Sequence, residues 1–307
     1  MAIAGLGGVS GVFITRNDAN HDVIIGVVDK SKYLMLNTAL RVPSFLALIS
    51  VWYIWVKRDE YLLTLADRHK HLLILLFLFL MNMVTNFPLA LARYWLGAMI
   101  IALVFCGLKK TNKTMSQWIV GFVVVLLVFF PITSEFRHME SITDVEKIEL
   151  SGVVKHLYHG DYDAFQQVMN TVQAVEYNGL SYGRNFLVAP LFWVPRSIWT
   201  SKPYGTGQEV AEAFRYDFTN LSEPLWAEAY YAFGYFGVAF ILFMYGFLSN
   251  RLDTLYQLES TGSLINIFVP FWCGFQLFFL RGDLLNGAAY SLPLIVIMVV
   301  VYRKKRV

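Results

Sequence analysis

The sequence is poor in charged residues, because Asp, Glu, Lys and Arg together make up 15% of its 307 positions. Hydrophobic residues account for 57% and aromatic residues for 16%. A soluble globular domain has about 25% charged residues, so this composition argues against one and indicates an integral membrane protein. The net charge of +3 is also too small to indicate a nucleic-acid partner.

Cysteine and the signatures of soluble enzymes are scarce as well. The two cysteines, Cys106 and Cys273, lie in apolar runs without metal-ligand spacing, so no disulfide framework or metal site is expected from them. The chain has no Walker motif, no GxGxxG after a strand and no Ser-His-Asp signature. Residues 2–15 lack the basic start of a cleavable signal peptide.

The apolar residues are concentrated in runs long enough for membrane helices, which need about 20 mostly apolar residues. Their spacing is helical rather than alternating, which favours a helical bundle over a barrel. We therefore predict an all-α polytopic membrane protein with about seven transmembrane helices, at 34–56, 71–87, 92–108, 117–133, 225–248, 264–280 and 287–302. Residues 1–15 would add a short or re-entrant eighth segment, unless the chain lacks N-terminal helices that a longer relative would have.

Lysine and arginine positions predict the orientation, since cytoplasmic loops of membrane proteins are enriched in both. Segments 57–70 and 109–116 and the C-terminal tail each carry several lysines or arginines, which predicts that they and the C-terminus are cytoplasmic. Segment 134–224 then lies outside, with seven Lys/Arg and twelve Asp/Glu, a net charge of about −5. The chain thus divides into N-terminal membrane helices (1–133), a large outer loop (134–224) and C-terminal membrane helices (225–307).

The outer loop is too long for a simple connection. Apolar spacing predicts helices over 141–157 and 162–176, and the string Asp161-Tyr162-Asp163 is interpreted as carboxylates at a helix start. Segment 186–203 is apolar but carries two prolines and is short for a full span. We predict that it is re-entrant or interfacial and borders a cavity, because irregular backbone at membrane depth must face protein or water.

Several cations fall on the outer side and could bind a phosphate, because arginine matches phosphate oxygens and lysine offers a point charge. Each also has a structural explanation. Arg93 and Arg281, at helix ends, could extend to lipid headgroups, and Arg41, inside a helix, could form an internal ion pair. The cations of the polar loop, Arg137, Arg184 and Arg215, could simply be solvated. The cations are Arg41, Arg93, Arg137, Arg184, Arg196, Lys202, Arg215 and Arg281.

Glu228 is the main acidic candidate, because it lies a few residues inside a predicted membrane helix. It could deprotonate a sugar hydroxyl, or it could form a buried ion pair with an arginine. Glu223 and Asp283 are further candidates at the same face. The loop histidines His138, His156 and His159 are alternative bases.

Three strings together resemble the Wzy-type O-antigen and oligosaccharide repeat-unit polymerase family. They are VPRSIWTSKPYGTG at 194–207, EPLWAEAYYAFGYFG at 223–237 and FLRGD at 279–283, with a weaker match in NFPLALARYWLG at 86–97. The resemblance covers roughly 186–290 and implies a GT-C-like membrane glycosyltransferase. Family members usually have about a hundred more residues, so an incomplete N-terminal half is expected.

The resemblance implies polymerisation of undecaprenyl-pyrophosphate-linked repeat units into O-antigen, capsule or exopolysaccharide at the periplasmic face of the bacterial inner membrane. The partners would be the lipid-linked donor and acceptor, the bilayer and a chain-length regulator protein. Alternatives are an O-antigen ligase or a transporter of lipid-linked sugars. Neither a metal nor another cofactor is expected, since the arginines supply positive charge.

The residues divide between two roles under this hypothesis. The catalytic candidates are Glu228, Arg196 and Arg281. The candidates for binding the pyrophosphate or stacking on a sugar are Lys202, Arg93, Arg137, Trp199, Tyr204 and Asp283; interfacial aromatic belts are the alternative explanation for the aromatic residues.

Overall fold

The computed structural model describes residues 30–87, 93–107, 116–117, 119–121, 123, 163–217, 219, 221–258 and 263–303. Over these ranges the chain is mostly helical and contains no strand, which confirms the all-α class. Three of the described helices are long and apolar enough to cross a membrane, in the ranges Thr38–Val56, Leu65–Thr85 and Leu225–Leu258. The number of seven spans stays a prediction.

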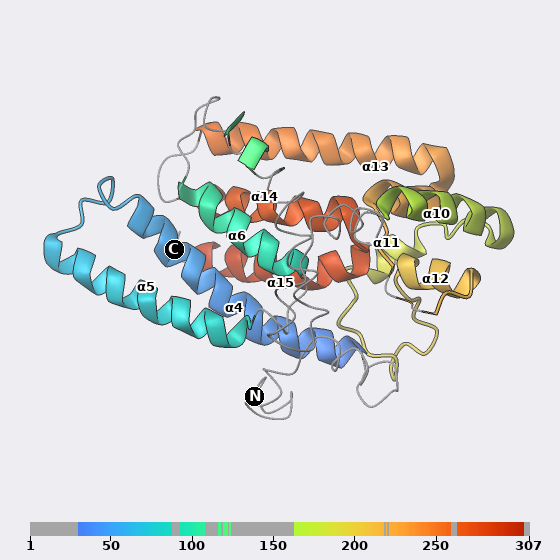
Figure 1. The fold of residues 1–307 in the computed structure, drawn as a ribbon, viewed down its shortest axis with the longest axis horizontal. Helices are drawn as coiled ribbons and strands as arrows, with labels where there is room; N and C mark the ends of the chain where they lie inside the picture. The colour runs from blue at the N-terminus through green and yellow to red at the C-terminus, as the bar shows by residue number, and fades with distance from the viewer. Residues whose placement is uncertain are drawn as a thin grey trace, which may run out of the picture.

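The membrane-type helices overlap the predicted apolar runs, although one of them continues ten residues beyond the end of its run. Run 117–133 lies mostly outside the described residues, as do residues 1–15. The helices lie alongside one another over much of their length (Figure 1). They are α4 (Lys30–Val56), α5 (Leu65–Thr85), α6 (Arg93–Gly107), α13 (Leu225–Leu258), α14 (Ile265–Arg281) and α15 (Leu284–Arg303).

The largest apolar core is built around Trp95 of α6, whose side chain is fully buried. Its ring lies 5.3 Å from that of Phe275 in α14 and 5.0 Å from that of Tyr290 in α15, measured between centroids. Helices α6 and α14 come very close at Gly274, where a Cβ would lie 2.2 Å from the carbonyl oxygen of Ala98. Small residues permit such close helix packing in membrane proteins.

A buried polar cluster joins α4, α5 and α6 within this bundle. Asn82 of α5 donates to the carbonyl of Ser44 at 2.9 Å, and Asn86 donates to the Ser44 hydroxyl at 3.1 Å. The indole nitrogen of Trp95 donates to the Asn86 side-chain oxygen at 2.9 Å. These bonds satisfy polar groups that would otherwise be costly in an apolar interior.

Much of the outer surface of the bundle is apolar. On α5, Leu73 is 67% exposed and Phe77 is 61% exposed, and α13 exposes Phe243 and Phe247 in the same way. A water-soluble protein rarely exposes such extended apolar surface. These exposed helix faces indicate a membrane protein whose helices contact lipid directly.

Helix α13 is interrupted near its start. Phe233 and Gly234 have non-helical dihedral angles, and Gly234 has φ +63° and ψ −150°, a region accessible essentially only to glycine. The break leaves the Tyr231 carbonyl free to accept from the Ser181 backbone N–H at 2.9 Å. The segment before the break, which carries Glu228, is thereby separated from the long apolar segment after it.

Three short helices gather at the end of the bundle where α13 begins (Figure 1). They are α10 (Ala164–Asn178), α11 (Arg184–Val188) and α12 (Thr206–Ala213). Helix α10 confirms the helix predicted over 162–176, whereas the one predicted over 141–157 lies outside the described residues. Residues 189–203, the main part of the predicted re-entrant or interfacial segment, form turns.

Candidate functional site

Glu228 lies at the centre of a buried polar cluster at this end of the bundle. Its Oε2 accepts from the side-chain amide of Asn185 in α11 at 2.5 Å and from the hydroxyl of Thr206 in α12 at 2.6 Å. Its Oε1 accepts from the backbone N–H of Leu284 at 3.0 Å. One carboxylate therefore ties together α11, α12, α13 and the start of α15, and its orientation is set by three donors.

Asp283 occupies the junction between α14 and α15, next to Glu228. Its Oδ2 accepts from the backbone N–H of Gly207 at 3.4 Å, and its Oδ1 accepts from that of Asn286 at 3.2 Å. Gly205 is in close contact, since a Cβ there would lie 2.3 Å from Oδ2. The start of α12 thus contacts both carboxylates, through Thr206 to Glu228 and through Gly207 to Asp283.

Glu223 adds a third carboxylate, just before α13. It is fully buried, and its Oε1 accepts from the hydroxyl of Thr171 in α10, whereas its Oε2 has no hydrogen-bond partner among the described residues. Burial raises the pKa of Glu223 well above its usual range, and repulsion from Glu228 raises it further. A protonated Glu223 is the form that this environment favours.

Arg281 approaches the same cluster from the end of α14. Its guanidinium lies 3.2 Å from Oδ1 of Asp163, the N-cap residue directly before α10, and both side chains are largely buried. Asp163 also accepts from Ser222 at 2.6 Å and from Gln167 at 2.9 Å. The Asp163 carboxylate is indeed at a helix start, as predicted, and its side chain pairs with a cation 118 positions away.

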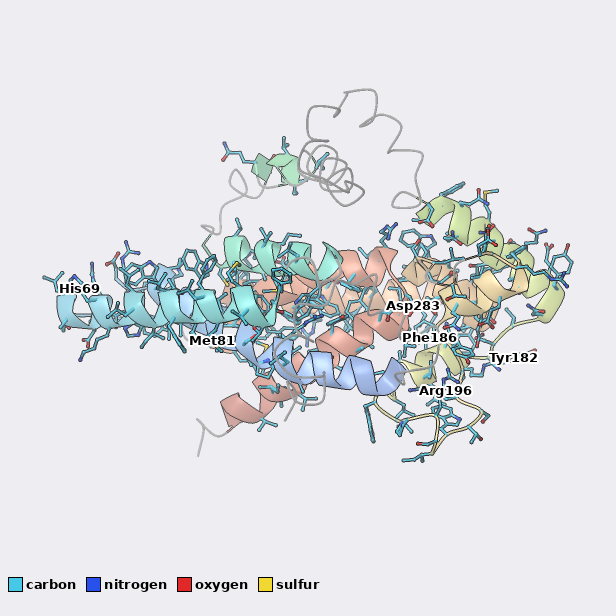
Figure 2. The ribbon with its side chains drawn as sticks, turned by 60° about the horizontal axis from the view of Figure 1, so that its bottom comes forward. His69, Met81, Tyr182, Phe186, Arg196 and Asp283 are labelled. Atoms are coloured by element: carbon cyan, nitrogen blue, oxygen red, sulfur yellow. The ribbon has the colours of Figure 1, made fainter. Side chains whose placement is uncertain are left out.

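Arg196 and Lys202 lie in the turns after α11, where they bond to backbone carbonyls of their own segment. The buried Lys202 ammonium donates to the carbonyls of Phe192 at 2.7 Å and Val194 at 2.8 Å. Arg196 donates to the carbonyls of Lys202 and, at 3.1 Å, Pro203. Figure 2 shows Arg196 and Asp283 at the same end of the molecule, remote from His69 and Met81.

The aromatic candidates lie beside these two cations. The Arg196 guanidinium carbon is 3.8 Å from the centroid of the Tyr204 ring, a close cation–π contact. Trp199 is partly buried against Val188, Phe192, Leu285 and Ala289.

The remaining predicted residues are not placed in the cluster. Arg93 begins α6, although its side chain lies outside the described part of the chain. Arg137 and the histidines at 138, 156 and 159 also lie outside the described residues.

Four polar residues of the cluster were not predicted as site residues: Asn185, Thr206, Thr171 and Asp163. Asn185, Thr206 and Thr171 do not stand out in the sequence, because threonine and asparagine are ordinary loop and helix-end residues. The nearest signal is the helix-start position of Asp163. Among the described residues, no group of three or more His, Cys, Asp or Glu side chains is arranged to hold a metal ion.

Comparisons with protein-family models, with curated proteins and with solved structures found no match.

Proposed function

We propose that this protein is a membrane glycosyltransferase that polymerises lipid-linked oligosaccharide repeat units, acting at the membrane face where α10, α11 and α12 lie. The observation that carries the proposal is the buried cluster of Glu228, Asp283 and Glu223 beside the Asp163–Arg281 pair. Burying several carboxylates is costly unless they are hydrogen-bonded or functional. The proposed location is the periplasmic face of a bacterial inner membrane, with the C-terminus cytoplasmic.

The proposed reaction joins the growing saccharide to an acceptor unit. The acceptor hydroxyl loses its proton to Glu228, and its oxygen bonds to C1 of the donor sugar. The bond between C1 and the pyrophosphate oxygen breaks, and undecaprenyl pyrophosphate leaves with the electron pair. Atoms and charge balance without an oxidant, a reductant or a cofactor.

Glu228 is suited to the role of base because its orientation is set by its three donors. The Thr206 hydroxyl, 2.6 Å away, is the donor that a substrate hydroxyl can replace most simply, since rotation about its Cα–Cβ bond releases the carboxylate. Asn185 and the Leu284 N–H hold the carboxylate in place meanwhile. Catalytic carboxylates commonly need such fixed positioning.

Arg281 is assigned to the leaving group, whose negative charge grows as the bond breaks. Its guanidinium bonds to Asp163 through one nitrogen, and the planar fork of an arginine matches pyrophosphate oxygens in geometry. Arg196 is half-buried and stacked on Tyr204, and we assign it to the edge of the same anion site. Lys202 is assigned to support of the loop, since its ammonium already bonds to two carbonyls.

The test is to delete the gene, restore it with variants, and analyse the saccharides attached to the lipid carrier. Single repeat units on the carrier are expected without the protein and with Glu228→Gln or Arg281→Ala. Long lipid-linked polymer would instead indicate a ligase, and unchanged surface polymer at normal protein levels would contradict the proposal. Accumulation of units confined to the cytoplasmic side would indicate a transporter.

Two controls separate chemistry from folding. Asp163→Asn breaks the ion pair but keeps the Arg281 charge, so polymer should persist if that charge acts on pyrophosphate. Arg184→Ala removes an exposed cation at the same end, paired with Glu209 at 3.1 Å, and should leave polymer length unchanged. Equal loss of polymer in Asp163→Asn and Arg281→Ala would reduce Arg281 to a structural role.

A further inference from the structure

The turns of residues 189–204, which we name the interfacial loop, pack against the apolar part of α15. Phe192 and Trp199 contact Leu285 and Ala289, together with Val188 of α11. Leu285 and Ala289 lie in the first two turns of α15, beyond the polar Arg281–Asp283 junction. At 1.5 Å per residue, Ala289 is roughly 9 Å along the helix from Asp283. The loop therefore packs beside residues of α15 that follow the polar junction and are apolar themselves.

The interfacial loop and the adjoining helix α11 also expose large apolar side chains. Trp193 is 53% exposed and Ile198 is 78% exposed, and Leu187 on the adjoining α11 is 57% exposed. The other exposed residues of the loop are uncharged, such as Ser197 and Thr200. Tryptophan with aliphatic neighbours is typical of the interface between membrane and water.

The backbone of the loop is unusually well supplied with donors. Lys202 bonds to the carbonyls of Phe192 and Val194, and Arg196 bonds to those of Lys202 and Pro203. An irregular segment next to lipid needs its backbone groups satisfied within the protein, because hydrocarbon offers no hydrogen bonds. The two buried or half-buried cations meet that need at four carbonyls.

Charge in this part of the sequence has one sign. Residues 177–208 contain no Asp or Glu, whereas Arg184, Arg196 and Lys202 are basic. An absence of carboxylates suits a surface that lies against lipid phosphates, which would repel them.

We propose that the exposed face of the interfacial loop, formed by Trp193 and Ile198 with Leu187, is inserted in the headgroup region of the bilayer. At this end of the bundle, the exposed apolar side chains of the loop would then extend the surface that contacts lipid. The occupant of this face is lipid, rather than a second copy of the chain or a soluble partner. Lipid contact at this face does not require the proposed glycosyl transfer, because it is argued from packing, exposure, backbone hydrogen bonds and charge.

The test uses an environment-sensitive fluorophore on single cysteines at Ile198 and Trp193 in reconstituted vesicles. The parent replaces Cys106 and Cys273 with alanine. The matched control is Phe165 on α10, which is 77% exposed but belongs to another element. Nitroxide-labelled phospholipids should quench the label at 198 and 193 several-fold more than at 165, and aqueous iodide should show the reverse order.

Equal quenching by iodide at 198 and 165 would overturn the proposal and indicate a water-facing loop. Self-quenching that disappears on dilution with unlabelled protein would also overturn it, in favour of a second copy. A second measurement tests the proposal even if the cysteine-free parent folds poorly. In the cysteine-containing protein, Trp193→Phe should lower the fraction of tryptophan emission that brominated lipid quenches, and an unchanged fraction would contradict the proposal.

Discussion

The buried carboxyl of Glu223 makes a sharp prediction about stability and pH. Its pKa is raised by burial first and by the neighbouring Glu228, Asp283 and Asp163 second, while the Thr171 hydrogen bond acts in the opposite direction. The folded state therefore binds the Glu223 proton more tightly than the unfolded state does. Its contribution to stability is complete below the unfolded pKa, about 4.3, and is lost as the pH rises toward the folded pKa.

The magnitude follows from the transfer of a single proton. Between the unfolded and folded pKa values, the free energy of unfolding should fall by up to about 1.4 kcal/mol for each pH unit. Glu223→Gln keeps the shape of the side chain and a carbonyl oxygen for Thr171 but cannot ionise. The free energy of unfolding of the variant should therefore fall less steeply with pH, by the contribution of one bound proton. At alkaline pH the variant should be more stable than the wild type.

The assay is thermal unfolding of the detergent-solubilised protein across a pH series, for wild type, Glu223→Gln and Glu212→Gln. Glu212 is exposed on α12 and serves as the matched control, with a slope expected to equal the wild-type slope. The reasoning is refuted if Glu223→Gln loses stability in parallel with the wild type as the pH rises. It is also refuted if the two replacements behave alike.

Two further replacements test the packing around the site. Lys202→Met leaves two carbonyls without their ammonium partner and should destabilise the protein by about 2–5 kcal/mol in thermal unfolding. The control Ser201→Ala, at an exposed neighbouring position, should change stability little. Equal stability of the two variants would contradict the role of Lys202. Gly205→Ala places a methyl group against the Asp283 carboxylate and should cost about 1–3 kcal/mol. Gly97→Ala is the control, because a Cβ at Gly97 would meet no described atom within 4 Å. A Gly205→Ala protein as stable as Gly97→Ala would show that the contact at Asp283 relaxes freely.

The helices could be predicted because apolar composition alone specifies them. The runs at 92–108 and 264–280 differ by one residue at each end from α6 and α14, since a membrane helix ends where its apolar run ends. The end of α13 was missed by ten residues, because the helix continues through the polar sequence 249–258. Its break at Gly234 has only a glycine as a signal, and most glycines in membrane helices do not break them.

The candidate site was predictable in its acids and less so in its pairings. Glu228, Asp283 and Arg281 were predicted because a charged side chain in or beside a membrane helix is costly and is usually paired or functional. The structure places all three at one end of the bundle. The Asp163–Arg281 pair spans 118 positions, and no local pattern indicates it. The carbonyl partners of Lys202 depend on the path of an irregular loop, which hydrophobic periodicity does not describe.

Reconstitution with purified protein tests the central claim most directly. Vesicles containing the protein and undecaprenyl-pyrophosphate-linked repeat units should release undecaprenyl pyrophosphate and form a ladder of longer saccharides. Glu228→Gln and Arg281→Ala should each slow the reaction on the order of 10²–10³-fold, the loss expected when a group that stabilises the transition state is removed. The account is contradicted if the folded wild-type protein forms no glycosidic bond, or if both variants turn over at the wild-type rate.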